Sequence, residues 1–514
     1  METWFLIVST LCISAILKAF YNLVFPSQEP GPKLPPGPPK FPIIGNLSWL
    51  RSYKSFPDLG PILRSVTTKF GPMVTLHIAY YPAIFVSDRS LAHQALVENG
   101  SVFADRSPAV KVGKTSIGSA AYGPTWRILR RNLTAEILNP SRIKSYSQVR
   151  TRVLQILKQQ LIKSRNTGDP ISVVDYFRHA MFCLFAHMCF GAHLDENQIR
   201  KVEVVQRDLL LNIHKFNALN FWPKVTRILL YKLWKESLQI KKNQADVFIP
   251  LIRARKKVTE GSLISKIKED KERKEEDDYI LSYVDTLLDL QLPEEKRKLD
   301  EGEIVTLCSE FLGAGTDPTS TALQWIMANL VKYPLVQEKL YMEIKGVVGE
   351  AAEEVKEDDL HRMPYLKAVI LEGLRRHPPA HFLFHGVRED VIFNDFLVPR
   401  KGIIIFFIEE MGLDPKIWED PLAFKPERFL RGEEEVDITG WKEIKMIPFG
   451  AGRRICPAHR LAMLHLGFFV ANLVWFFEWK AKDGDDVDLS EKKELTFVMK
   501  NPLQACIYSR PRQV

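Results

Sequence analysis

The chain has 514 residues and a mass of 59.1 kDa, enough for one large core or for two or three ordinary domains. Its net charge of +9 suits an anionic membrane surface or an acidic protein partner. No basic stripe interleaved with aromatic residues is present, so nucleic acid is not an expected partner. The cysteines form no CxxC pair and are too sparse for a disulfide scaffold, which suits a reducing compartment: Cys12, Cys183, Cys189, Cys308, Cys456 and Cys506.

Residues 1–26 are predicted to form an N-terminal membrane anchor. Segment 4–25 is apolar except for Lys18, and about 20 apolar residues span a bilayer. No basic stretch precedes it and no small-residue cleavage site follows it, which argues against the alternative of a cleaved signal peptide. Lys18, Lys33 and Lys40 end or follow the segment, so the positive-inside rule predicts a single pass with a cytosolic body.

Residues 27–46 are predicted to be a proline-rich hinge. Each proline fixes φ and removes an amide donor, so this stretch is stiff and extended. The remaining residues, 47–514, read as one large domain that is mainly α with a minor β portion. A hairpin is expected over 69–87, mostly helix over 89–350, and further strands within 380–406.

The strongest motif is Pro-Phe-Gly-Ala-Gly-Arg-Arg-Ile-Cys-Pro-Ala at 448–458. A metal-binding thiolate at Cys456 needs backbone amides aimed at its sulfur. Gly452 allows a tight turn beneath a flat cofactor. Arg454 offers a forked donor for a carboxylate, and Phe449 can shield the sulfur from water.

This segment resembles the haem-binding loop of the cytochrome P450 family, F-x-x-G-x-R-x-C-x-G, except that Ala458 replaces the last glycine. The resemblance implies a cytochrome P450 fold, a haem-thiolate catalytic domain over 47–514, and haem b ligated through its iron by Cys456. The alternative is a buried free cysteine in a glycine-rich loop. Segment 461–477 has helical length, and the dipole at its N-terminus would favour the thiolate.

Two further motifs place residues around the haem. Trp126 and Arg130 resemble the family's W-x-x-x-R, which implies that both bind a haem propionate together with Arg454. They are four residues apart and so share one helix face. His385 occupies the place of another propionate partner in microsomal members, with an ordinary structural histidine as the alternative.

Glu372-Gly373-Leu374-Arg375 resembles the family's E-x-x-R, and Pro-Glu-Arg-Phe at 426–429 resembles its PERF element. Residues three apart on a helix can pair, and a surface ion pair would contribute little stability. The resemblance instead implies a buried structural triad of Glu372, Arg375 and Arg428.

The stretch 314–319, Ala-Gly-Thr-Asp-Pro-Thr, resembles the family's oxygen-binding stretch, A-G-x-[DE]-T-[TS], within a helix predicted over about 300–331. In the family, the acid and the following threonine deliver the protons that O–O cleavage needs. Asp317 keeps the acid, whereas Pro318 replaces the threonine. Thr319 lies about 100° further round the helix and cannot simply substitute.

Pro318 has two expected consequences. It removes the amide that would bond to the carbonyl of Ala314, which predicts an opened or kinked helix. It also lacks a hydroxyl, so we expect a water held by the Ala314 carbonyl and Asp317 to take its place. The alternatives are poor coupling of oxygen use to product, or chemistry without oxygen activation.

The motifs occur in family order along nearly the whole chain. The sequence most resembles plant microsomal members of the A-type group, and among them those of family eighty-nine. The resemblance implies an endoplasmic reticulum membrane location and a monooxygenase that inserts one atom of O2 into a small, apolar organic substrate. The expected pocket lining includes Phe311, Phe382 and Phe384. The alternatives, which Pro318 favours, are a haem-thiolate isomerase or lyase acting on peroxides, and a haem-binding protein without turnover.

No flavin or nicotinamide motif is present in the sequence. Electrons are therefore expected from NADPH through a separate NADPH-cytochrome P450 reductase. Basic residues near the thiolate loop can dock its acidic face: Lys442, Lys445, Arg453 and Arg460.

Overall fold

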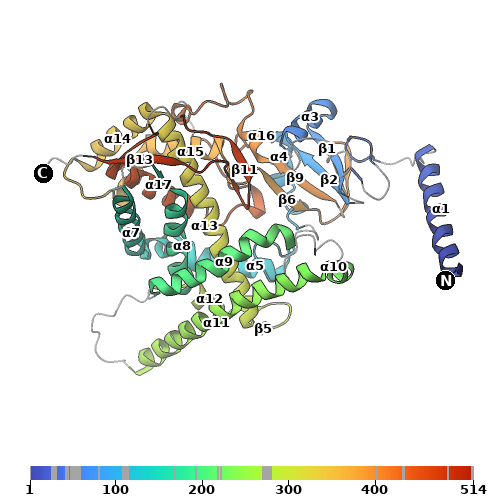
Figure 1. The fold of residues 1–514 in the computed structure, drawn as a ribbon, viewed down its shortest axis with the longest axis horizontal. Coiled ribbons are helices and arrows are strands. Elements are labelled where there is room, and N and C mark those ends of the chain that lie inside the picture. Colours follow the sequence, from blue (N-terminus) through green and yellow to red (C-terminus); the bar gives the residue numbers. More distant parts are fainter. Residues whose placement is uncertain are drawn as a thin grey trace.

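A computed structural model describes residues 2–24, 32–40, 45–46, 60–78, 81–106, 115–165, 170–191, 194–216, 219, 223–268, 280–400, 402–430, 435–482 and 486–510. Figure 1 shows a helical body with a small sheet at one end, and α1 (Glu2–Val24) standing apart from both. The expectation of a mainly α fold with a minor β portion is confirmed.

Helices form most of the described body. They are α3 (Gly60–Phe70), α4 (Arg89–His93), α5 (Pro124–Asn132), α6 (Pro140–Ser145), α7 (Ser147–Arg165), α8 (Val174–Phe190), α9 (Glu196–Phe216), α10 (Pro223–Leu229), α11 (Tyr231–Lys268), α12 (Tyr283–Leu288), α13 (Glu301–Lys332), α14 (Pro334–Val348), α15 (Pro364–Arg376), α16 (Ile408–Gly412) and α17 (His459–Phe476). Short π- and 3-10 turns cover Gln94–Glu98, Leu133–Ile137, Glu357–Arg362, Pro426–Phe429 and Gly452–Arg454.

The largest sheet has the order β1-β2-β9-β6, with bounds Met73–Ile78, Tyr81–Val86, Ile403–Phe407 and Phe382–Gly386. The pairing of β1 with β2 confirms the hairpin predicted over 69–87, and β9 joins β2 in parallel, pairing Ala83 with Ile403. Strand β9 (Ile-Ile-Ile-Phe-Phe) lies between β2 and β6 and is buried throughout. Its sequence is a continuous apolar run because both of its faces are covered.

The other strands form smaller sheets. They are β3 (Ile171–Ser172) with β10 (Phe477–Lys480) and β13 (Gln504–Ser509), β4 (Gln291–Leu292) with β5 (Arg297–Lys298), β7 (Val391–Phe393) with β8 (Phe396–Val398), and β11 (Glu491–Lys493) with β12 (Phe497–Met499). Strand β10 was not predicted, because it continues the apolar run of α17 and the sequence shows no boundary between them.

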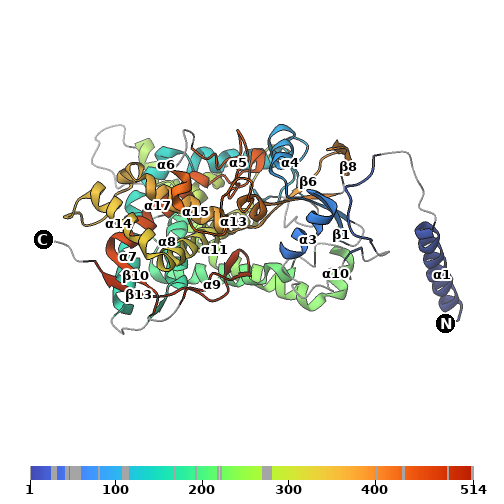
Figure 2. The same cartoon turned by 90° about the horizontal axis from the view of Figure 1, so that it is seen from above.

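Helix α13 crosses the middle of the body, where α8, α15 and α17 pack around it (Figures 1 and 2). Its start is fixed by a capping box, in which Glu303 N–H donates to Asp300 and the Asp300 amide donates to Glu303. A side chain at Gly315 would lie 2.4 Å from the Phe185 ring, so this glycine allows α8 to approach closely. The predicted helix over about 300–331 is confirmed.

Among the described residues, one helix is long and apolar enough to cross a membrane, namely His459–Phe476. It is mostly buried inside the fold and so serves as a core helix. The stretch Ser9–Lys18 in α1 is apolar but shorter. Leu11 and Phe20 of α1 are 65% and 63% exposed, and the boundaries at residues 26 and 46 remain predictions.

Candidate active site

Cys456 lies in a tight loop between the turn Gly452–Arg454 and the start of α17. Its amide donates to the Phe449 carbonyl at 2.8 Å, which closes the loop. Gly452 has φ +68°, and a side chain there would lie 1.9 Å from the Leu96 carbonyl oxygen. Only glycine fits this position.

The environment of the Cys456 sulfur combines burial with nearby positive charge. Burial raises the pKa of the thiol, while the amide of Ala458, which donates to the sulfur, and the guanidinium of Arg130 oppose that rise. Alanine at 458 keeps this amide, so the departure from the family glycine leaves the donor in place. The buried sulfur and its N–H donor match what a thiolate ligand to iron requires.

The structure brings the predicted propionate-binding residues together beside this loop. Arg454 donates to the carbonyls of Ala104 at 2.7 Å and Ala120 at 2.7 Å, and its guanidinium lies 4.4 Å from the Trp126 ring centroid. Trp126 Nε1 donates to the Ile117 carbonyl at 3.0 Å. Arg130 Nη2 donates to the carbonyl of Ile455, next to Cys456, at 2.5 Å.

Arg106 joins these groups and was not predicted. Burial, together with the charges of Arg106 and Arg130, lowers the pKa of Arg454 to about 9, against opposition from Asp105. Burial likewise lowers the pKa of Arg106 and Arg130. Three partly buried cations that repel one another favour an anionic ligand. This donor set therefore fits haem, whose two propionates are anionic, with Cys456 as the ligand to its iron.

His385 lies at the same place and is buried. Its Nδ1 contacts the Phe103 carbonyl at 2.6 Å. Burial, together with the charges of Arg106 and Arg454, lowers the pKa of His385 to about 3, so the ring is neutral and donates to the carbonyl. The position next to Arg454 agrees with a role beside a propionate, which remains a prediction.

On the oxygen side, Asp317 lies in α13 with its side chain largely buried. Its Oδ1 lies 3.8 Å from Nε of Arg178 on α8. Burial raises the pKa of Asp317, while Arg178 and Arg207 lower it and Glu494 raises it. A carboxyl group with a raised pKa can both release and accept protons closer to neutral pH.

Helix α13 continues through Pro318 without a break. The structure therefore shows no interruption of the helix where the sequence predicts an opening. Thr319 is buried, and its side chain leaves the helix about 100° round from that of Pro318. The hydroxyl of Thr316 is buried and has no hydrogen-bond partner among the described residues. Thr316 and Asp317 line one small recess with Arg178 and Arg207, and the sequence analysis had not singled out Thr316.

Glu372, Arg375 and Arg428 meet in the core as expected. Arg375 donates to both oxygens of Glu372, at 2.7 and 2.8 Å, and Arg428 Nε donates to Oε1 at 3.1 Å. Arg375 also donates to the carbonyl of Gly412 at 2.8 Å, which ties α15 to α16. Glu372 and Arg375 are fully buried, so this is a core network and not a surface ion pair.

Glu310 is a third residue that sequence reasoning missed. Its carboxylate, one turn before Ala314, accepts the amides of Ile117 and Gly118 and the hydroxyl of Ser116, and so fixes the loop that also carries the carbonyl bonded by Trp126. Burial raises the pKa of Glu310, and these three donors oppose the rise. An acid inside an apolar helical stretch was the available signal.

The aromatic residues expected to line a pocket divide into two groups. Phe311 packs in the core, with ring centroids 4.9 Å from Tyr283 and 5.6 Å from Phe185. Phe382 stacks on Phe407 at 4.9 Å, and Phe384 is 42% exposed. Only the last two, on β6, remain as candidates for contact with a ligand.

Comparison with known proteins agrees with this geometry. The model of the family described as Cytochrome P450 matches residues 35–507. The chain is 50% identical to "Cytochrome P450 89A9" of Arabidopsis thaliana over 98% of both chains, which supports the resemblance to family 89. It is 31% identical to an isoflavone 3'-hydroxylase of Medicago truncatula over 93% of each chain, and 29% identical to a geraniol 8-hydroxylase of Catharanthus roseus over 92% of this chain and 93% of that one. With a thiolate loop, a donor set that fits haem and a match over almost its full length, the chain belongs to the cytochrome P450 family as a haem-thiolate monooxygenase.

Proposed function

We propose that this monooxygenase takes electrons from NADPH through a separate reductase and inserts one oxygen atom into a small, largely apolar organic molecule. The observation that carries the proposal is the buried Cys456 loop beside a cluster of cations that fits haem. The haem supplies the oxygen chemistry, while the protein supplies the ligand, the proton route and the pocket. Phe382 and Phe384 support an apolar ligand, as do the names of two relatives, which act on geraniol and an isoflavone.

A haem-thiolate isomerase or lyase acting on peroxides is the second candidate. Pro318 supports it, because the hydroxyl used for proton delivery is missing. The retained Asp317, largely buried and with a raised pKa, supports the monooxygenase instead. Substrate-dependent NADPH consumption with a purified plant reductase would favour the proposal. Conversion of a fatty-acid hydroperoxide without a reductase would favour the second candidate.

We propose that the reductase docks on the basic face outside the thiolate loop. Arg453 and Lys442 are exposed there, and Arg127 of α5 and Arg453 both lie against the Tyr122 ring, 5.1 and 5.7 Å from its centroid. Complementary charge speeds encounter and is screened by salt.

Arg453→Glu is expected to slow reduction of the haem by the reductase about tenfold at low ionic strength, because it reverses a charge on the docking face. The difference should shrink as salt is added. Stopped-flow reduction under CO measures it, with the exposed Lys201→Glu on α9 as the matched control. Equal rates for both variants would contradict docking at this face.

We also propose that α1 anchors the protein in the endoplasmic reticulum membrane with the body in the cytosol. Its exposed apolar side chains, including Leu11 and Phe20, support this location. Removal of residues 2–25 is expected to move the protein from floated membranes to the soluble fraction. Replacement of Leu11 by Asn alone, as a control, should leave it on the membranes. A truncated protein that still floats quantitatively would argue against α1 as the principal anchor.

A further inference from the structure

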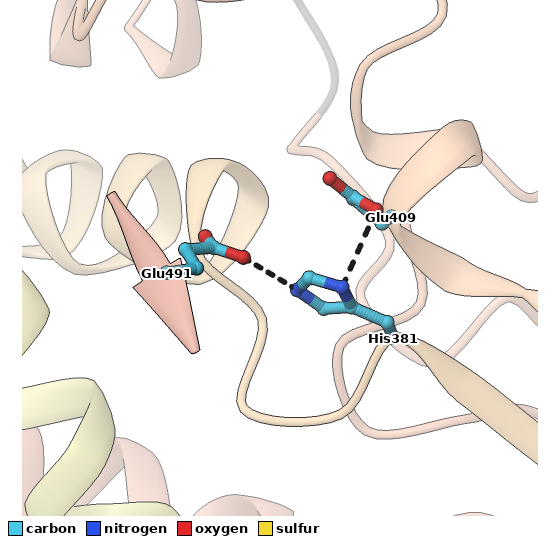
Figure 3. A group of neighbouring side chains, drawn as sticks. All are labelled: His381, Glu409 and Glu491. Carbon is cyan, nitrogen blue, oxygen red and sulfur yellow. Dashed lines mark ion pairs between the residues drawn. The ribbon is translucent and has the colours of Figure 1, made fainter. Parts of the chain in front are cut away.

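A cluster of ionisable side chains joins three segments that are far apart in the sequence (Figure 3). His381, which precedes β6, lies between two carboxylates: its Nδ1 is 3.3 Å from Glu409 and its Nε2 is 3.2 Å from Glu491. His377 adds a second contact to Glu491, through Nδ1 at 2.9 Å. Burial disfavours the charge of Glu491, but the two histidines outweigh it and lower the pKa of this carboxyl to about 2.

The arrangement is that of a bridge and not of a metal site. Figure 3 shows His381 using one ring nitrogen for each carboxylate, so the imidazole ring bridges the two, although one ligand atom of each residue lies within 4.8 Å of the others. The carboxylates already have partners, because Arg64 pairs with Glu409 and Glu410 at 2.8 Å each and both histidines contact Glu491. A divalent cation would have to displace these contacts.

Glu491 begins the β11–β12 hairpin, and the turn of this hairpin rests against α13. Thr496 and Thr321 share a hydrogen bond at 2.8 Å, and Trp325 Nε1 donates to the Phe497 carbonyl at 2.9 Å. Thr321 lies one turn beyond Pro318. The hairpin therefore adjoins the oxygen side of α13.

The same hairpin also contacts the segment between α15 and β6. The Phe497 amide donates to the Pro379 carbonyl at 3.0 Å, and the rings of Phe497 and His381 stack in parallel. Two residues after His381, Leu383 lies 3.4 Å from where a side chain on Gly450 would stand. One hairpin thus joins the oxygen side of α13 to the strand that packs on the thiolate loop.

The contact between the hairpin and α13 also affects the pKa of Asp317. Glu494, in the turn of the hairpin, lies close enough to Asp317 to raise the pKa of its carboxyl and to affect Arg178. Movement of the turn would change the charge around Asp317 and the position of the Phe497 side chain.

We propose that Glu491, held by His377 and His381, is a positioning residue that latches the β11–β12 hairpin onto α13 and so sets both the substrate wall and the surroundings of Asp317. The role rests on the proposed function in one respect only, namely that a substrate binds beside Asp317. Glu491 touches neither the haem-binding cluster nor Asp317, so its effect on turnover passes through the hairpin.

Glu491→Gln retains the size and an acceptor for His377 but removes the charge that holds His381. We expect amide hydrogen exchange at Phe497 and Lys500, measured on the purified holoenzyme, to rise about tenfold because the hairpin opens more often. His381→Phe, which keeps the stack on Phe497 and removes both ion contacts, should give the same rise. Glu410→Gln removes a neighbouring ion pair with Arg64 that does not involve the hairpin, and it should leave exchange unchanged.

A second measurement tests the shape of the ligand cavity and needs neither a reductase nor a native substrate. Imidazole and 4-phenylimidazole are titrated into the ferric holoenzyme, and the ratio of their affinities is compared between variants. Glu491→Gln should change this ratio about fivefold, since only the larger ligand reaches the displaced wall. Unchanged exchange and an unchanged ratio in both latch variants would overturn the proposal. Because neither measurement uses electron transfer, such a result is distinct from a failure of the proposed function.

Discussion

Glu372→Gln is expected to lower the free energy of unfolding by about 3–5 kcal/mol, the usual loss when one partner of a buried charge network is removed. Glu372 is fully buried and accepts four hydrogen bonds, from Arg375 twice, from Arg428 and from the Lys425 amide. The neutral amide cannot balance two guanidinium groups, and its NH2 would face one of them. The buried Arg375 is then left with an uncompensated charge.

Guanidinium-induced unfolding of the holoenzyme, followed by far-UV circular dichroism, measures this loss. The control is Glu196→Gln, which breaks an ion pair with Arg200 at 2.6 Å on the surface of α9. An exposed pair of this kind should contribute little. A Glu372→Gln protein as stable as the control would show that the triad is not a structural lock.

The triad also shows which parts of the site can be predicted from sequence. The pairing of Glu372 with Arg375 follows from helical spacing, and the resemblance to the family added Arg428 from more than fifty residues away. Arg106 escaped prediction because nothing in its local pattern is unusual. Glu310 stands out only as an acid in an apolar helical stretch, which does not show what it contacts. Both become important only in the folded protein, where each is partly buried and contacts the loop at 115–120.

A similar limit applies to the donors around the haem-binding loop. The resemblance to the family grouped Trp126, Arg130 and Arg454, and the structure places them together; spacing alone relates only Trp126 to Arg130, on one helix, and Arg454 to Cys456. It did not indicate that they would donate to the carbonyls of Ile117, Ala104 and Ile455. Those carbonyls belong to irregular loops whose paths depend on long-range packing, and no local periodicity encodes them.

Asp317→Asn is expected to lower kcat about 10²-fold with little change in KM, because a positioned acid contributes about that much to proton transfer. The amide keeps the size and polarity of the side chain but cannot release a proton. Arg178, which lies 3.8 Å from Asp317, would lose only a long ion pair, so the fold should be unaffected. Steady-state turnover with the reductase measures the change, and product formed per NADPH should fall together with kcat. A variant with full kcat and full coupling would remove Asp317 from the proton route.

The residue after Asp317 is expected to affect how that proton travels. Pro318→Thr restores both the amide that Ala314's carbonyl lacks and the hydroxyl, whereas Pro318→Ala restores only the amide. If the missing hydroxyl limits proton delivery, product per NADPH should rise about twofold or more in the threonine variant and not in the alanine variant. If a water between the Ala314 carbonyl and Asp317 has replaced the hydroxyl, alanine should lower coupling, because the helix reclaims that carbonyl as an acceptor. Unchanged coupling in both variants would contradict both accounts and leave the buried hydroxyl of Thr316, beside Asp317, as the group to replace next.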